Sequence, residues 1–141
     1  MSPPVLAVRD LAVRIGGRRI VRDVSVRVEP EQTLGIVGES GSGKSMTVLA
    51  ATGLLDAPGA QVRGSSVLAG DQELVGASAR ALRRVHGGRI GFVFQDPGTS
   101  LNPLLTVERQ ITESLETHKN QTRRQARSRA LELLEAVGLD V

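Results

Sequence analysis

The feature that most constrains this chain is a glycine-rich segment of eight residues, Gly38–Ser45. Its sequence, Gly-Glu-Ser-Gly-Ser-Gly-Lys-Ser, matches the pattern G-x-x-x-x-G-K-[ST] at every fixed position. Glycines let the backbone curl so that successive N–H groups point at phosphate oxygens, where a side chain would block the approach. The segment therefore predicts a phosphate-binding loop that leads from a buried strand into a helix.

The residues of this loop predict a nucleotide site with a magnesium ion. A helix that starts after the loop would add unpaired N–H groups and the positive end of its dipole. Lys44 is the predicted catalytic cation for the β- and γ-phosphates, and the Ser45 hydroxyl is a predicted Mg²⁺ ligand. Met46 can contribute only its backbone N–H. The predicted nucleotide-binding residues are Gly38, Glu39, Ser40, Gly41, Ser42, Gly43, Lys44, Ser45 and Met46.

Apolar patterning predicts strands in the first part of the chain and helices at the end. Residues 5–14 and 19–28 alternate apolar and polar side chains around Gly16-Gly17, which is typical of two strands joined by a tight turn. Apolar runs at Thr33–Val37 and Arg89–Phe94 predict buried strands. The other predicted elements are a strand at 65–68 and helices at 45–55, 78–85, 107–118 and 122–137.

Composition narrows the classes of function. Hydrophobic residues make up 40% and charged residues 23% of the chain, as in an ordinary globular protein. Aromatic residues make up only 1%, which argues against stacking on single-stranded nucleic acid. The basic run Lys119–Arg129 is flanked by glutamates, which favours a solvated helix face over a nucleic-acid or lipid patch. No signal peptide or membrane span is predicted, so we expect membrane association only through a partner.

Three segments resemble one known family. Residues 35–45 closely resemble the Walker A segment of ABC ATPases, and Phe92–Pro97 is similar to their Q-loop. Gln95 of that segment lies 51 residues after Lys44. The continuation Gly98–Val107 is similar to the subfamily that serves dipeptide, oligopeptide and nickel importers. The resemblance covers nearly the whole chain.

The resemblance implies an α/β fold of the ABC-type P-loop NTPases with an N-terminal antiparallel β subdomain. The whole of residues 1–141 would be the N-terminal part of an ABC-type ATP-binding domain. Within it, the β subdomain would comprise residues 1–32 and the P-loop core, up to the Q-loop, residues 33–97. Residues 98–141 would begin the helical subdomain, inside which the chain would be truncated.

The resemblance also implies an activity and partners. The protein would be a peripheral ATP-binding subunit at the cytoplasmic face of the membrane. It would couple ATP binding and hydrolysis to the import of peptides, or of solutes such as nickel, through membrane permease subunits. Gln95 would be catalytic and a Mg²⁺ ligand, and would relay the nucleotide state. A second ATP-binding subunit would complete the site, and an extracytoplasmic solute-binding protein would act indirectly.

Some features of the family are missing from this sequence. The hairpin at Val13–Ile20 has no aromatic residue to stack on adenine, and Glu31 replaces a usual glycine. We find no Leu-Ser-Gly-Gly-Gln-like signature and no Walker B strand. His86 and His118, the only histidines, precede the expected switch position. We therefore expect a fragment that is not catalytic alone. Two alternatives stay open: a soluble ABC ATPase of DNA repair or translation, and a non-catalytic remnant.

Overall fold

A computed structural model describes residues 3–96, 98 and 100–139. The chain divides into two compact units at the junction of Leu82 and Arg83. The first unit contains a four-stranded sheet and helix α1 (Lys44–Ala51), and the second contains the helices α3 (Val107–Lys119) and α4 (Arg123–Ala136). Helix α2 (Ala79–Val85) spans the junction. The fold is α/β with an N-terminal antiparallel sheet, as the sequence predicted.

The sheet has the strand order β2-β1-β3-β4, and every neighbouring pair is antiparallel. Its strands are β1 (Leu6–Ile15), β2 (Arg18–Val28), β3 (Ala60–Leu68) and the two-residue β4 (Gln72–Glu73). Gly16 and Gly17 join β1 to β2 with positive φ angles of 55° and 79°, which a two-residue hairpin turn of this kind requires. The predicted hairpin is therefore confirmed. β3 is longer than the predicted strand because residues 60–63 also pair with β1.

The register of the hairpin shifts at three places, and two of these are β-bulges at matching Arg-Asp pairs. The first lies between Val8 and Leu11 and the second between Val21 and Val24, and the register shifts at both places. Asp10 and Asp23 adopt positive φ angles of 48° and 44° there. Each bulge adds one residue, so the apolar residues on both sides of it stay on the core face.

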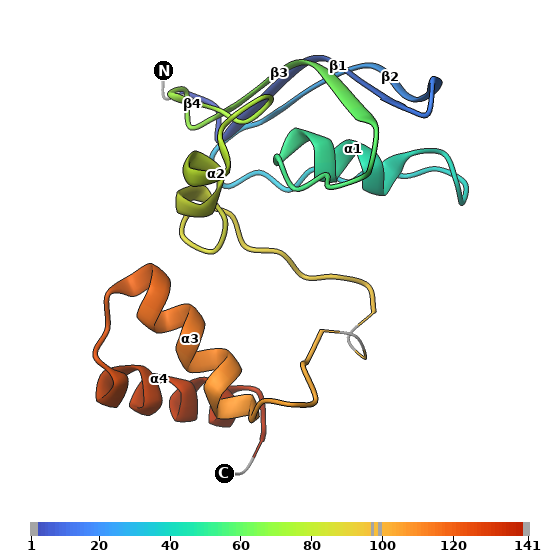
Figure 1. The fold of residues 1–141 in the computed structure, drawn as a ribbon. Helices are drawn as coiled ribbons and strands as arrows, with labels where there is room; N and C mark the ends of the chain where they lie inside the picture. Colours follow the sequence, from blue (N-terminus) through green and yellow to red (C-terminus); the bar gives the residue numbers. More distant parts are fainter. Residues whose placement is uncertain (1–2, 97, 99, 140–141) are drawn as a thin grey trace. The chain divides into compact units, whose positions relative to one another are not determined.

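Helix α1 packs on one face of the sheet, as Figure 1 shows. The core of this unit consists of Val8, Leu11, Val13, Val21, Ala50 and Ala51. The buried hydroxyl of Ser66 on β3 donates a hydrogen bond to the carbonyl of Ala51, which ties the sheet to the end of α1. The helix ends earlier than predicted, because Gly53 turns the chain with a φ of +70°.

The two buried strands predicted at 33–37 and 89–94 are wrong. Residues 33–37 contain no strand, and Val37 is 93% exposed. Residues 89–94 contribute only one isolated bridge, between Ile90 and His86, and Val93 is fully exposed. The physical reason is that an apolar run indicates only that its side chains favour burial. A strand also needs the backbone of a second strand to complete its hydrogen bonds. Neither run has a strand partner among the described residues.

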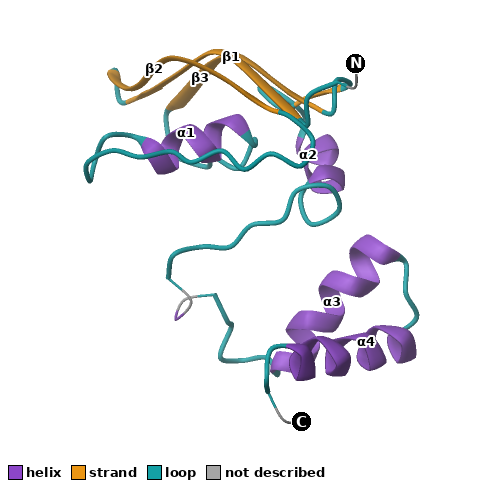
Figure 2. Ribbon diagram, turned by 180° about the vertical axis from the view of Figure 1, so that it is seen from behind, coloured by secondary structure: helices purple, strands orange, loops and turns teal. Residues whose placement is uncertain are grey.

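The second unit is built on a helix pair, α3 and α4, visible in Figure 2. Thr106 and Thr122 cap the two helices, and Thr122 forms a capping box with Gln125. An ion pair of 3.2 Å joins Arg127 Nε to Glu108 Oε1 across the pair. Both helices begin and end within a residue or two of the predicted bounds. In the described part of the chain, no helix is both long and apolar enough to cross a membrane.

Candidate functional site

The glycine-rich loop lies in the first unit and leads directly into α1. Gly43 has a φ of +92°, and a Cβ atom added to it would lie 3.0 Å from the carbonyl oxygen of Ile20 on β2. A Cβ on Gly38 would lie 2.8 Å from Ser42 Oγ. Gly41 has a φ of +80° with open space around it. Gly43 is therefore favoured both by its backbone conformation and by a close backbone contact, and Gly41 by its backbone conformation, whereas a Cβ on Gly38 would displace only the Ser42 hydroxyl.

Lys44 is folded back over the loop. Its Nζ atom donates hydrogen bonds to the carbonyl oxygens of Gly38 at 2.8 Å and Glu39 at 2.7 Å, and to Ser42 Oγ at 3.4 Å. These acceptors come from residues 38–42, all of which are exposed. The ammonium group is thus fixed at the open side of the loop, where it can attract an anion.

The start of α1 also suits an anion. Its N-cap residue, Gly43, supplies no side-chain cap, and its first turn contains no acidic residue. The backbone N–H groups of this turn therefore have no competing side-chain acceptor at the cap, and the positive end of the helix dipole lies there. The Thr47 hydroxyl bonds back to the Gly43 carbonyl at 2.9 Å, one turn inside the helix. Together with Lys44, this geometry fits a phosphate group.

The predicted magnesium ligands belong to different units. Ser45 is exposed on the first turn of α1, whereas Gln95 is exposed in the second unit. Their approach to one another stays a prediction. Among the described residues, no group of three or more His, Asp or Glu side chains gathers in a way that could hold a metal ion.

Both phenylalanines of the chain lie just before Gln95. The rings of Phe92 and Phe94 stack with centroids 5.9 Å apart, and His86 meets Phe92 edge-on at 5.7 Å. Asp96 Oδ1 accepts a hydrogen bond from the Gly98 N–H at 3.0 Å. Pro97 of the Q-loop-like segment and Thr99 of the importer-like segment lie outside the described residues.

Sequence reasoning missed the part that β2 plays in the site. The carbonyl of Ile20 lies against Gly43 and limits the space behind the loop. No local sequence pattern predicts this contact, because it depends on how closely β2 and the loop approach one another in the folded unit. Sequence patterns did contain the signal for the two bulges: Val-Arg-Asp-Leu at 8–11 is followed by Val-Arg-Asp-Val at 21–24.

The comparisons with known proteins identify relatives in transport systems. The oligopeptide transport ATP-binding protein OppD of Mycobacterium tuberculosis is 48% identical over 141 residues, covering 96% of this chain and 23% of the relative. The dipeptide transport ATP-binding protein DppD of Haemophilus influenzae is 42% identical over 139 residues, covering 96% of this chain and 42% of the relative. The peptidoglycan transport ATP-binding protein YejF of Agrobacterium fabrum is 44% identical over 142 residues, covering 98% of this chain and 26% of the relative.

These alignments cover most of this chain but only part of each relative. The chain spans between 23% and 42% of the length of the three relatives above. The family model described as "ABC transporter" matches residues 21–141, which include the whole glycine-rich loop and Gln95. The chain therefore belongs to the ABC transporter family.

Proposed function

We propose that this chain is part of an ATP-binding subunit that couples ATP binding and hydrolysis to the import of peptides. The observation that carries the proposal is the loop geometry at Gly38–Ser45, with the positive φ angles of Gly41 and Gly43 and the lysine bonded to the loop. The printed names of the relatives, which describe oligopeptide and dipeptide transport, support the choice of peptides over nickel.

The roles of the residues follow from the chemistry of phosphoryl transfer. The loop N–H groups and the first turn of α1 position the phosphates, and Lys44 offsets their negative charge. Ser45 and Gln95 are the residues that would hold Mg²⁺, which when bound neutralises charge that develops on the phosphate oxygens. Gln95 also orients the attacking water. Catalysis here consists of positioning and electrostatic stabilisation.

The proposal includes partners and a location. Permease subunits span the membrane, and the ATP-binding subunit binds to them at the cytoplasmic face of the membrane. A second ATP-binding subunit shares the nucleotide interface, and a solute-binding protein delivers the peptide to the permease. The division into a β subdomain at 1–32, a P-loop core at 33–97 and a helical region from residue 98 also belongs to this proposal.

A comparison of the two lysines of the chain tests the nucleotide site. Lys44 bonds to the loop, whereas Lys119 is exposed at the end of α3. We expect Lys44→Ala to weaken ATP binding by about tenfold or more, since hydrogen bonds to charged groups contribute about 1.5–3 kcal/mol, and to abolish phosphate release. Lys119→Ala removes the same charge and should change neither the affinity for ATP nor the rate of phosphate release.

The assay is a titration with a fluorescent ATP analogue, followed by phosphate release in the presence of Mg²⁺, on the purified full-length protein. Near-normal turnover of Lys44→Ala would refute the assignment of the site. Normal nucleotide handling without any effect of the permease or peptide on the turnover rate would instead leave the nucleotide site standing and refute peptide import.

A further inference from the structure

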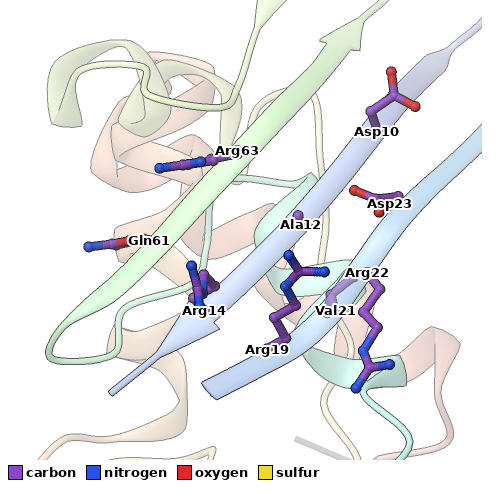
Figure 3. Close-up of a pocket in the computed structure, with 9 residues that line it drawn as sticks. All are labelled: Asp10, Ala12, Arg14, Arg19, Val21, Arg22, Asp23, Gln61 and Arg63. Atoms are coloured by element: carbon purple, nitrogen blue, oxygen red, sulfur yellow. The ribbon is translucent and has the colours of Figure 1, made fainter. Parts of the chain in front are cut away.

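A second concentration of positive charge lies away from the loop, on the face of the sheet opposite α1. Four arginines, Arg14, Arg19, Arg22 and Arg63, line a hollow of about 180 Å³ over strands β1, β2 and β3. In Figure 3 the Arg19 side chain is directed toward Ala12, whereas the Arg22 side chain extends away from it. All four arginines are exposed. None of them takes part in nucleotide binding as proposed above.

The register of the sheet puts like charges directly opposite one another. Arg14 pairs with Arg19 on β2 and with Gln61 on β3. Arg63 is opposite Ala12, in the neighbouring row. Like charges in directly opposed positions destabilise an antiparallel sheet. The arrangement therefore costs stability unless an anion offsets the charge.

The protein itself does not neutralise these arginines in the described part of the chain. Arg14 Nη2 donates a hydrogen bond to the Gly17 carbonyl at 3.3 Å, and no ion pair joins any of the four guanidinium groups to a carboxylate there. Two aspartates, Asp10 and Asp23, also line the hollow. Both lie at the bulges, toward one end, while Arg14 and Gln61 line the other (Figure 3). The carboxylates thus repel an anion from one end and leave the other end cationic.

We infer that this hollow binds a small phosphate compound with several negative charges. Guanidinium groups present forked donors that match phosphate oxygens in pairs. A hollow of about 180 Å³ is below the range of roughly 300–1,000 Å³ typical of sites for drug-sized ligands, so a small anion fits better than a whole nucleotide. Bulges are common beside binding sites, where they redirect side chains, and here they border the hollow.

Pyrophosphate is a suitable probe once the loop site has been disabled. We expect Lys44→Ala protein to bind pyrophosphate at low ionic strength in a calorimetric titration. Adding Arg14→Gln and Arg19→Gln should weaken that binding by about tenfold, since each charge-assisted hydrogen bond contributes substantially. The matched control, Arg123→Gln with Arg124→Gln on α4, removes the same charge and should leave the affinity within about twofold.

Several results would overturn the inference. These are the absence of pyrophosphate binding to Lys44→Ala protein, an equal loss in the α4 control, and tighter binding of an acidic peptide than of pyrophosphate. Should the double variant fail to show the circular dichroism of the parent, Arg63→Gln alone provides the test. It should weaken binding by about threefold or more, and an unchanged affinity would contradict the inference. Every protein in this comparison carries the same Lys44→Ala change, so a difference between them reports on the hollow and does not depend on the proposed ATPase function.

Discussion

Alanine at Gly43 should destabilise the protein far more than alanine at Gly41, although both glycines belong to the same loop. Both have positive φ angles, 92° and 80°. The left-handed conformation costs a residue with a Cβ roughly 1–2 kcal/mol. At Gly43 the new Cβ would also lie 3.0 Å from the Ile20 carbonyl oxygen, whereas nothing lies within 4 Å of it at Gly41.

The contact with Ile20 sets the size of the difference. Strand backbone cannot move aside as readily as the end of a flexible side chain can, so crowding of this kind costs about 1–3 kcal/mol. We therefore expect Gly41→Ala to lower the free energy of unfolding by roughly 1–2 kcal/mol. Gly43→Ala should lower it by roughly 2–5 kcal/mol, the sum of the strain and the crowding.

Urea unfolding followed by far-ultraviolet circular dichroism measures both changes, with the free energies taken from linear extrapolation. Gly76→Ala is a further control, because Gly76 has a φ of +72°, open space around it and no part in the loop. It should behave as Gly41→Ala does. Equal losses for the variants at Gly41 and Gly43 would refute the reasoning, because they would show that Gly43 does not lie against β2.

Three further predictions concern coupling, acid stability and charge. Gln95→Ala should reduce transport-linked hydrolysis in the full-length protein while nucleotide affinity stays within about twofold; a loss of binding as large as that of Lys44→Ala would assign Gln95 the wrong role. Partial burial raises the pKa of Glu73, but hydrogen bonds from the Ser65 hydroxyl and nearby N–H groups outweigh it and leave the pKa below its ordinary 4.5. The stability that Glu73 contributes is therefore present above pH 4.5 and lost as the pH falls below it. The urea midpoint of Glu73→Gln should consequently fall less than that of the parent protein when the pH is lowered. An equal fall of the two midpoints would contradict this reasoning. Arg14→Gln should raise the free energy of unfolding by about 0.2–1 kcal/mol without added anion, because it removes a like-charge pair, and a lowered midpoint in urea would argue against that repulsion.

The sequence predicted the elements whose signal is local. The hairpin followed from alternation around Gly16-Gly17, and the helix predicted at 122–137 lies within a residue of the observed bounds of α4. The loop and its helix followed from a motif whose four fixed positions, Gly38, Gly43, Lys44 and Ser45, are dictated by the chemistry of phosphate binding. These features need no information about distant parts of the chain.

The parts that could not be predicted depend on neighbours far away in the sequence. The apolar run at 33–37 was predicted as a buried strand, but strand formation needs a partner that the run itself cannot reveal. The hollow on the outer face brings Arg14 together with Arg63 across 49 positions, through a register that the bulges shift. The placement of Gln95 relative to Ser45 stays a prediction for the same reason, since the two residues lie in separate units.

The hydrogen bonds of Lys44 have a consequence for the thermodynamics of ligand binding. Because the loop carbonyls and Ser42 already satisfy the ammonium group, an incoming phosphate exchanges hydrogen bonds with the loop instead of simply adding new ones. The net enthalpy that Lys44 contributes to phosphate binding is then smaller than the number of its hydrogen bonds to the phosphate would indicate. The same bonds hold the lysine and the loop in order beforehand, so less conformational entropy is lost on association. The loop therefore has the character of a preorganised receptor, whose affinity should respond more to changes in its stiffness than to added charge.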